Sequence, residues 1–359
     1  MTALTGLGAG LGAAPGAAPG AGFGAAPGAA AAPLPHGGDL AAARRLFPGA
    51  PAPFLDLSTG ISPHAWPLPA LPAEAFTRLP GPDALAGLLA AAAARYGAPS
   101  AAHVVAAPGT QILLPLVAGL VAPGRANVLA PTYAEHARAA ALAGHAVAEV
   151  TDAAALAGAD LAVVVNPNNP DGRLVTPADL RALAATAAAR GGLVVVDEAF
   201  MDVGPAGASL LPDLPAGAVV LRSFGKFHGL AGLRLGFAIA APEIAARLSA
   251  RLGPWAVSGP AIAVGAAALA DDAWATATRA RLAADAARLD GLLAAAGLAV
   301  AGGTALFRLV RTPDAAALHD RLGRAGILVR RFPERPADLR FGLPADEPAW
   351  GRLAAALGG

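Results

Sequence analysis

Cysteine is absent from this chain of 359 residues, and lysine occurs only once. Without cysteine the chain can form no disulfide, use no thiolate nucleophile and build no cysteine-ligated metal site. The seven histidines show no metal-ligand spacing, so we expect no metal. These absences are compatible with a reducing compartment, and we expect a cytoplasmic protein.

Strong charge and long apolar runs are also missing. The formal net charge is +1 and the arginines form no extended basic run, which predicts neither nucleic-acid nor membrane-surface binding. Proline, glycine or charge interrupts every apolar run before the ~18 residues that a spanning helix needs. The N-terminus lacks the positive region of a secretory signal. We therefore expect no membrane segment.

The single lysine is Lys226, in the stretch LRSFGKFHGLAGLRLGF over residues 221–237. Arginine stays protonated and cannot act as a nucleophile, whereas a lysine in a dry pocket can lose its proton and condense with a carbonyl. Because all other basic positions are arginine, we interpret Lys226 as an imine-forming lysine. The alternative is a surface lysine that survived by chance.

Other rare residue types also mark candidate chemistry. Gln111 is the only glutamine, Tyr96 and Tyr133 are the only tyrosines, and three of the four asparagines lie in NPNNPDG over residues 166–172. In a sequence dominated by alanine, glycine, proline and arginine, such residues indicate where side-chain chemistry was retained.

The N-terminal part divides into two segments. Residues 1–35 are almost entirely Ala, Gly, Pro and Leu, which predicts a low-complexity, disordered extension. Residues 36–82 form an irregular arm with a short helix at 40–46 and an extended segment at 54–57. We expect this arm to lie over another part of the protein or over a partner subunit.

Residues 83–250 alternate between helical patterns and short apolar runs. Continuous apolar runs are typical of a parallel sheet that is covered on both faces. The pattern therefore predicts a large α/β domain with a mostly parallel sheet and, over residues 251–359, a smaller α+β domain. The predicted strands of the large domain are 103–107, 127–130, 146–150, 161–165, 193–196, 219–221 and 235–239.

Gly109, Asn169, Asp197 and Lys226 each follow a predicted strand. Ligands of open α/β sheets bind at the carboxyl ends of the strands, so we expect these four residues to share one site. An imine-forming lysine at such a site suggests pyridoxal 5′-phosphate (PLP), which needs a phosphate anchor, a partner for its ring nitrogen and a ring support.

The predicted phosphate anchor is the PGTQ turn at residues 108–111, which precedes an apolar helix. Backbone N–H groups of Gly109, Thr110 and Gln111 would point at the anion, and the helix dipole would favour it. Ser223 and Arg234 would add a hydroxyl and a guanidinium. Taken by itself, Gly109 would indicate only an ordinary turn between a strand and a helix.

The predicted ring partners are Asp197, Tyr133 and Asn169. A carboxylate that ends the buried strand VVVDEAF needs a cationic partner or a set of hydrogen bonds, and a protonated ring nitrogen would supply the partner. Tyr133 can stack on the ring and Asn169 can hydrogen-bond its phenolic oxygen. The alternatives are a capping aspartate and a core tyrosine.

The order and spacing of PGTQ, PTY, NPNNPDG, VVVDEAF, SFGKFHGLAGLRLGF and DLRFG resemble the fold-type I PLP enzymes of the aspartate aminotransferase superfamily. Within it, HGGDL, LDLSTGISP and the lysine motif are most similar to the L-threonine-O-3-phosphate decarboxylases of cobalamin biosynthesis, close relatives of histidinol-phosphate aminotransferases. The resemblance implies PLP, a homodimer and a phosphorylated amino acid as substrate.

Carried onto this chain, the resemblance implies Lys226 as the Schiff-base lysine, Asp197 at the ring nitrogen and Arg340 at the substrate carboxylate. It makes Arg330 and His36 candidates for the substrate phosphate, and Arg331 or Arg335 could serve equally. Two departures are Phe200 and Leu79, which stand where related enzymes often have tyrosines.

The implied reaction is decarboxylation of O-phospho-L-threonine to (R)-1-amino-2-propanol phosphate. Which Cα bond stands perpendicular to the cofactor plane decides between decarboxylation and transamination, and residue types alone leave that choice open. The alternatives are an aminotransferase acting on histidinol phosphate or a related amino acid, and a catalytically silent binding protein.

Overall fold

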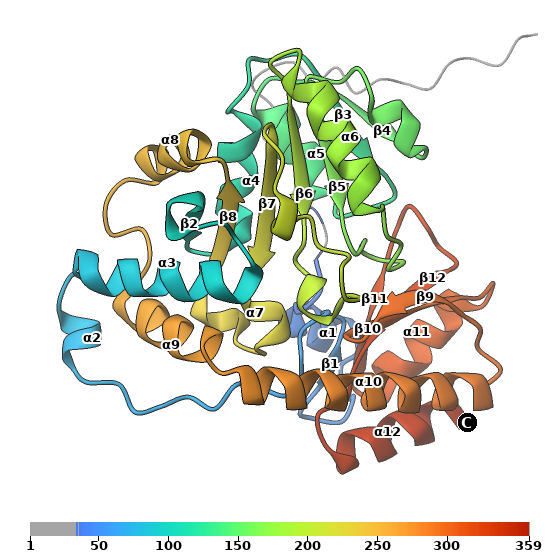
Figure 1. Cartoon of the computed structure of the whole chain (residues 1–359). Helices are drawn as coiled ribbons and strands as arrows, with labels where there is room; N and C mark the ends of the chain where they lie inside the picture. Colours follow the sequence, from blue (N-terminus) through green and yellow to red (C-terminus); the bar gives the residue numbers. More distant parts are fainter. Residues whose placement is uncertain (1–33, 35, 359) are drawn as a thin grey trace, which may run out of the picture. The chain divides into compact units, whose positions relative to one another are not determined.

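The computed structural model describes residue 34 and residues 36–358, so the predicted extension over residues 1–35 lies almost wholly outside the described part. Two sheets and their covering helices make up the described fold (Figure 1). The helices are α1 (Leu40–Leu46), α2 (Glu74–Thr77), α3 (Pro82–Tyr96), α4 (Thr110–Ala118), α5 (Glu135–Leu142), α6 (Pro177–Ala188), α7 (Phe224–Phe227), α8 (Pro242–Leu252), α9 (Gly259–Leu269), α10 (Asp272–Ala295), α11 (Ala315–Arg324) and α12 (Glu347–Gly358).

The larger sheet has the strand order β2-β8-β7-β6-β5-β3-β4. All neighbouring pairs are parallel except those of β8, which runs against both β2 and β7. The predicted mostly parallel sheet is therefore confirmed. Its strands are β2 (Val104–Ala107), β3 (Arg125–Leu129), β4 (Ala146–Val150), β5 (Leu161–Val165), β6 (Leu193–Asp197), β7 (Ala218–Ser223) and β8 (Gly236–Ala240).

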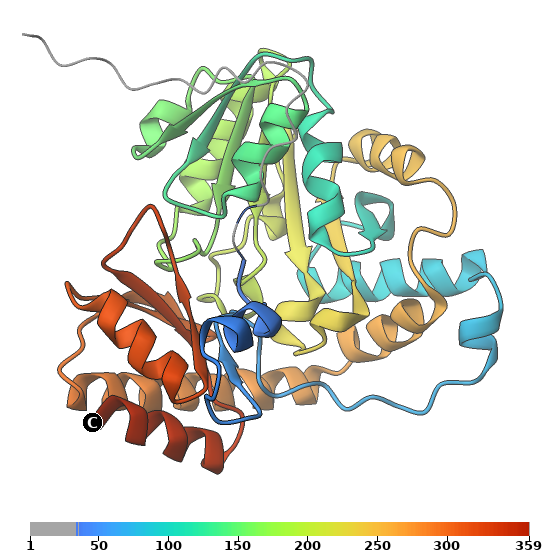
Figure 2. The ribbon, with the colours of Figure 1, turned by 180° about the vertical axis from the view of Figure 1, so that it is seen from behind.

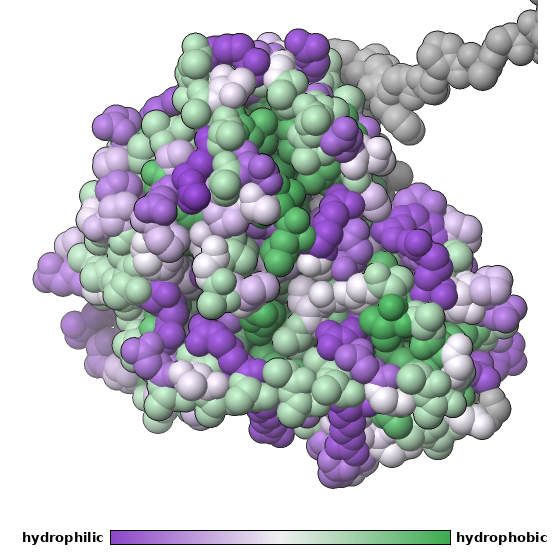
Figure 3. Space-filling model, turned by 45° about the vertical axis from the view of Figure 1, so that its right-hand side comes forward, coloured by the Kyte–Doolittle hydropathy of each residue, from purple (hydrophilic) through white to green (hydrophobic). Residues whose placement is uncertain are grey.

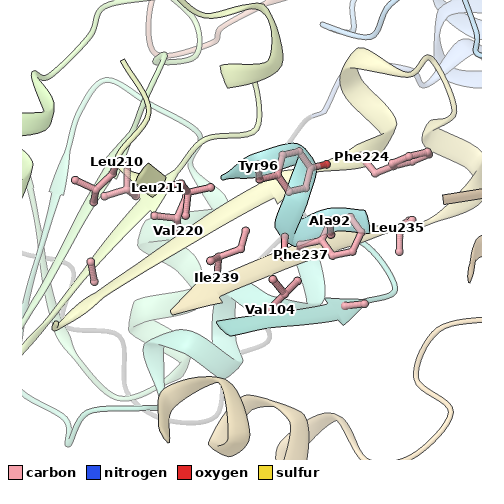
Figure 4. Packing of buried hydrophobic residues seen from close by; sticks show 14 of the residues in the cluster. Ala92, Tyr96, Val104, Leu210, Leu211, Val220, Phe224, Leu235, Phe237 and Ile239 are labelled. Atoms are coloured by element: carbon pink, nitrogen blue, oxygen red, sulfur yellow. The ribbon is translucent and has the colours of Figure 1, made fainter. Parts of the chain in front are cut away.

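Helices cover this sheet on both faces, which explains the continuous apolar runs. Val194 and Val196 of β6 belong to the core that α3, α6 and α9 cover, whereas Val195 belongs to the core under α4, α5 and α8. Successive side chains of a strand point to opposite faces, so a strand buried on both sides has no polar positions to alternate with. Figure 4 shows part of the first core, with Val104, Val220 and Ile239 beside Tyr96 and Phe237.

The smaller sheet has the order β1-β11-β12-β10-β9, with strands β1 (Leu55–Leu57), β9 (Val300–Thr304), β10 (Phe307–Arg311), β11 (Ile327–Arg331) and β12 (Asp338–Gly342). Strand β1 comes from the N-terminal arm and pairs in parallel with β11, with Leu55 opposite Ile327. The arm therefore completes the smaller sheet, and Figure 2 shows it beside the C-terminal elements.

Figure 3 shows hydrophilic residues scattered among weakly hydrophobic ones on one face. Among the helices of residues 36–358, none combines the length and the apolar character of a membrane-spanning segment.

Candidate active site

A cavity of about 330 Å³ lies at the carboxyl ends of the parallel strands. Loops after β2, β3, β5, β6 and β7 line it, together with residues of the smaller sheet and the arm. Every predicted site residue lines this cavity: His36, Gly109, Thr110, Gln111, Tyr133, Asn169, Asp197, Ser223, Lys226, Arg234, Arg330 and Arg340. Parallel strands bring these distant positions to one edge, as expected.

Lys226 sits on the one-turn helix α7 directly after β7. Its backbone carbonyl accepts a hydrogen bond of 2.8 Å from the amide of Ser62, which ties the lysine turn to the arm. Burial lowers the pKa of Lys226 to about 8, with help from the nearby charges of Arg340 and Arg234, while Asp197 opposes the shift. A lysine with this pKa is partly neutral slightly above pH 7 and can act as a nucleophile.

Asp197 ends β6 and is buried at the cavity. One carboxylate oxygen accepts from the backbone amide of Ala199 at 3.0 Å, and the other lies 2.8 Å from Nε2 of buried His136. Sequence analysis missed His136, although it follows Tyr133 by three residues. A carboxylate has about four acceptor positions, so Asp197 can still take a further donor from the cavity.

Tyr133, Gln111, Glu135 and His36 form a chain of hydrogen bonds along the cavity. The Tyr133 hydroxyl donates to Oε1 of Gln111 at 2.9 Å, and the Gln111 amide donates to Oε2 of Glu135 at 3.0 Å. The other Glu135 oxygen lies 3.0 Å from Nε2 of His36. Burial raises the pKa of Tyr133 to about 12, so the hydroxyl keeps its proton. Glu135 was not predicted, and it holds both Gln111 and the arm.

Gly109 and Arg234 meet closely at the start of α4. Gly109 has a φ of 86°, and a Cβ at this position would lie 2.7 Å from Nη2 of Arg234. Only glycine accommodates both that backbone conformation and that contact without strain. The guanidinium of Arg234 thus lies against the first turn of α4, where the helix presents unpaired N–H groups.

Arg340 is buried and is held at two nitrogens. Its Nη1 donates to Oδ1 of Asn169 at 2.5 Å and its Nη2 donates to the carbonyl of Ser58 at 2.7 Å. Within the described part of the chain its Nε has no hydrogen-bond partner. Burial lowers the pKa of Arg340 to about 9, and the charge of Arg330 adds to this shift. The charges of buried Arg340 and partly buried Arg330 thus repel each other, which favours an anionic ligand.

The structure distinguishes between the three arginines that were candidates for binding the substrate phosphate. Arg330 lines the cavity, with its guanidinium 5.4 Å from the ring centre of Phe332, whereas neither Arg331 nor Arg335 does. Arg335 instead forms an ion pair with Asp338.

The two residues that replace tyrosines of related enzymes, Phe200 and Leu79, lie in different surroundings. Phe200 lines the cavity without a hydroxyl, and Nζ of Lys226 lies 5.9 Å from its ring centre. Its ring packs edge to face on Phe307 at 5.0 Å. Leu79 is 68% exposed and does not line the cavity.

The donor set fits PLP. The cavity offers an amine of lowered pKa, a carboxylate with spare acceptor capacity, and a helix N-terminus beside a guanidinium. These match the aldehyde, the ring nitrogen and the phosphate of that cofactor. No group of three or more potential metal ligands occurs among residues 36–358.

Comparisons with known proteins agree with this geometry. Residues 59–357 match the model of the family "Aminotransferase class I and II". The threonine-phosphate decarboxylase of Pseudomonas aeruginosa is 48% identical, over 90% of this chain and 97% of that protein. The threonine-phosphate decarboxylase of a Sinorhizobium species is 46% identical, over 91% and 98%.

A solved structure shares the fold. Histidinol-phosphate aminotransferase from Sinorhizobium meliloti, determined in complex with pyridoxal-5′-phosphate, superposes with a TM-score of 0.75 at 24% identity. It covers 90% of this chain, and 94% of that chain is matched. The chain therefore belongs to the class I and II aminotransferase family of PLP-dependent enzymes.

Proposed function

We propose that the chain is a PLP-dependent decarboxylase that converts O-phospho-L-threonine into (R)-1-amino-2-propanol phosphate and CO2, acting in the cytoplasm. The observation that carries the proposal is the placement of two further arginines, Arg340 and Arg330, in the cavity that holds Lys226. A substrate that carries both a carboxylate and a phosphate would present one anionic group to each of these two arginines. The names of the 46–48% identical relatives support the same substrate class.

In the proposed site, Lys226 would hold the cofactor, and Asp197 would accept a hydrogen bond from its protonated ring nitrogen. Tyr133 would support the ring. Asn169 would donate from Nδ2 to the phenolic oxygen, because its Oδ1 already accepts from Arg340. The cofactor phosphate would be bound by Gly109, Thr110, Gln111, Ser223 and Arg234. When bound, PLP supplies an aldehyde and an electron-withdrawing ring that takes up the electron pair of the bond broken at Cα.

Arg340 fixes the substrate carboxylate in this proposal. Its bonds to Asn169 and Ser58 restrain rotation of the guanidinium, so a carboxylate bound to it would keep one orientation. If this orientation lies out of the plane of the bound cofactor, it would favour loss of CO2 over loss of the Cα proton. Lys226 then delivers a proton to Cα from Nζ, and buried Phe200 and Phe307 keep water from that side.

Arg330 binds the substrate phosphate, and His36 assists from the arm. His36 is already bonded to Glu135, so it reaches the phosphate only through its other ring nitrogen or after leaving that carboxylate. Arg330 is therefore the main phosphate ligand in this account.

The assay that tests the proposal supplies phosphothreonine to the PLP-loaded protein and follows CO2 release. A parallel reaction supplies histidinol phosphate with 2-oxoglutarate and follows glutamate. We expect CO2 with phosphothreonine and little glutamate. Glutamate without CO2 would favour the aminotransferase alternative, and neither product together with no cofactor absorbance would favour the silent binding protein.

Gly109→Ala tests the phosphate anchor. The added methyl group would displace Arg234 and strain the backbone at a φ of 86°, which we expect to weaken PLP affinity by roughly 10-fold or more. Fluorescence titration of the apoprotein with PLP measures this affinity. Gly97→Ala is the matched control, since Gly97 has a φ of 75° and no atom within 4 Å of a Cβ. Equal PLP affinities of the two variants would contradict the anchor.

We also propose a homodimer that uses the surface around Trp255. Trp255 is 60% exposed although its φ is 58°, and Leu79 is 68% exposed beside Pro80. Trp255, Pro80, Leu85 and Leu89 line a largely apolar cavity of about 260 Å³. A non-glycine residue held in the left-handed region with its ring in solvent is poorly explained within one chain.

Trp255→Asp is expected to weaken this dimer by roughly 30-fold or more, because truncating a central aromatic contact typically removes about 2 kcal/mol. Sedimentation velocity over a concentration series measures the change. Leu142→Asp is the control, since Leu142 is 70% exposed on α5 and outside this surface. An unchanged dimer in the Trp255 variant would contradict the assigned surface.

A further inference from the structure

Behind the lysine turn lies a group of buried polar side chains that the proposed reaction does not use. We name Tyr96, Asp202, Arg222, His228 and Arg95 the inner polar cluster. Each contributes one buried atom that has no hydrogen-bond partner within residues 36–358: Tyr96 Oη, Asp202 Oδ2, Arg222 Nε, His228 Nε2 and Arg95 Nη2. Tyr96, Asp202, Arg222 and His228 are each at most 5% exposed.

The members of the inner polar cluster lie close together. The guanidinium of Arg222 stands 4.4 Å from the ring centre of Tyr96. The charges of Asp202 and Arg95 act on both Tyr96 and His228, where burial raises the pKa of the tyrosine and lowers that of the histidine. Figure 4 shows the Tyr96 hydroxyl directed toward Phe224 of α7. The contact between Arg222 and Tyr96 and the shared charges place the inner polar cluster in one buried region, formed by α3, β7, η3 (Met201–Val203) and the end of α7.

His228 supplies an acceptor to this region. Its Nδ1 lies 3.2 Å from the carbonyl oxygen of Phe224, and a carbonyl can only accept, so Nδ1 carries the proton. Burial lowers the pKa of His228, which keeps the ring neutral and leaves a lone pair on Nε2. That lone pair faces no donor among the described residues.

Asp202 is the member of the inner polar cluster that most needs a further hydrogen-bond donor. The residue is 4% exposed, and its buried Oδ2 has no hydrogen-bond partner within the described part of the chain. Arg279 donates only to its backbone carbonyl, at 2.7 Å. A buried carboxylate oxygen without a donor is disfavoured, so we expect a further donor at Oδ2.

The chemistry of the inner polar cluster selects the missing partner. Arg222 Nε and Arg95 Nη2 only donate, Asp202 Oδ2 and His228 Nε2 only accept, and the Tyr96 hydroxyl does both. Asp202 would repel an anion. The guanidiniums already form ion pairs with Glu198 and Asp272, and their remaining N–H groups only donate and so cannot bind a cation. A small neutral molecule that both donates and accepts satisfies all of them, and water is that molecule.

We propose that the inner polar cluster is a binding site for buried water, which joins α7 to α3 and η3. Phe224, Phe227 and His228 occupy the inner face of the lysine turn and are at most 1% exposed. The His228 ring lies between those of Phe224 and Trp274, at 4.2 Å and 5.5 Å in near-parallel stacks. The stacked rings and the water together stabilise the inner face of the lysine turn, while Lys226 on its other side lines the cavity.

Diffraction from crystals of the PLP-loaded protein, at a resolution that shows ordered solvent, tests the site directly. We expect water within hydrogen-bond distance of Asp202 Oδ2 and of Tyr96 Oη or His228 Nε2. Direct hydrogen bonds among these side chains with no water between them would overturn the proposal.

A double-mutant cycle tests the site in solution. Tyr96→Phe and His228→Phe each remove one polar atom and keep a ring, and His228→Phe keeps the stack on Trp274. We expect each variant to lower the midpoint of thermal unfolding and the pair to lower it by less than the sum, because both atoms bind the same water. Tyr96→Phe combined with His103→Phe is the control, and we expect that pair to be additive.

Additive shifts in the Tyr96 and His228 cycle would overturn the proposal. If His228→Phe does not fold, Asp202→Asn replaces it in the cycle, with the same two outcomes.

Discussion

Lys226→Arg is expected to lower kcat/KM for CO2 release by roughly 10³-fold or more, with little change in the midpoint of thermal unfolding. The substitution keeps a positive charge but removes the only side-chain amine of the chain. Arginine cannot reach the neutral, nucleophilic state that burial makes accessible to Lys226, whose pKa is lowered to about 8. Steady-state assays with phosphothreonine at saturating PLP measure the effect.

The matched control is Arg324→Lys, which exchanges the same two residue types on the exposed surface of α11. We expect this control to retain full activity, although it adds a second lysine. Substantial turnover by the Lys226 variant would contradict the assigned role and, with it, the proposed chemistry.

Asp197→Asn is expected to lower kcat by roughly 10²-fold to 10³-fold, the range found when one preorganised electrostatic group is removed from a water-excluded site. The amide keeps nearly the same shape and can still accept from the amide of Ala199. It no longer carries the charge that favours a protonated ring nitrogen, and it also loses the charge that faces His136. Single-turnover kinetics at saturating PLP separate this effect from weaker cofactor binding.

Asp285→Asn is the control for the aspartate. Asp285 makes the same kind of contact, 2.6 Å from Nε2 of His64, but outside the cavity. We expect this variant to keep its kcat. Equal losses in both variants would mean that Asp197 acts only by stabilising the fold.

The larger sheet was predictable because its strands are buried on both faces. Leu193 to Val196 and Leu161 to Val165 are uninterrupted apolar runs, and both are fully buried strands in the structure. Bounds for α5, α6 and α9 were not predicted, since alanine-rich helices show little contrast between their inner and outer faces. Pairing of β1 with β11 joins Leu55 to Ile327, and no local pattern predicts such a distant contact.

The lining of the site was predictable, but its internal partners were not. Lys226, Asp197 and Asn169 follow strands, so topology alone brings them to one edge. His136 and Glu135 lie on α5, and their partners Asp197 and His36 are distant in sequence. Hydrogen bonds between remote residues depend on side-chain positions that periodicity does not encode. The same holds for Asp202 and His228, which sequence analysis did not single out.

The most direct test of the central claim reduces the PLP-loaded protein with borohydride, which fixes the cofactor to the amine that holds it. Peptide mass mapping then locates the added mass. Because Lys226 is the only lysine, the account predicts that the peptide containing it carries the cofactor at near-stoichiometric yield. Protein that has bound PLP but leaves the Lys226 peptide unmodified would contradict the account.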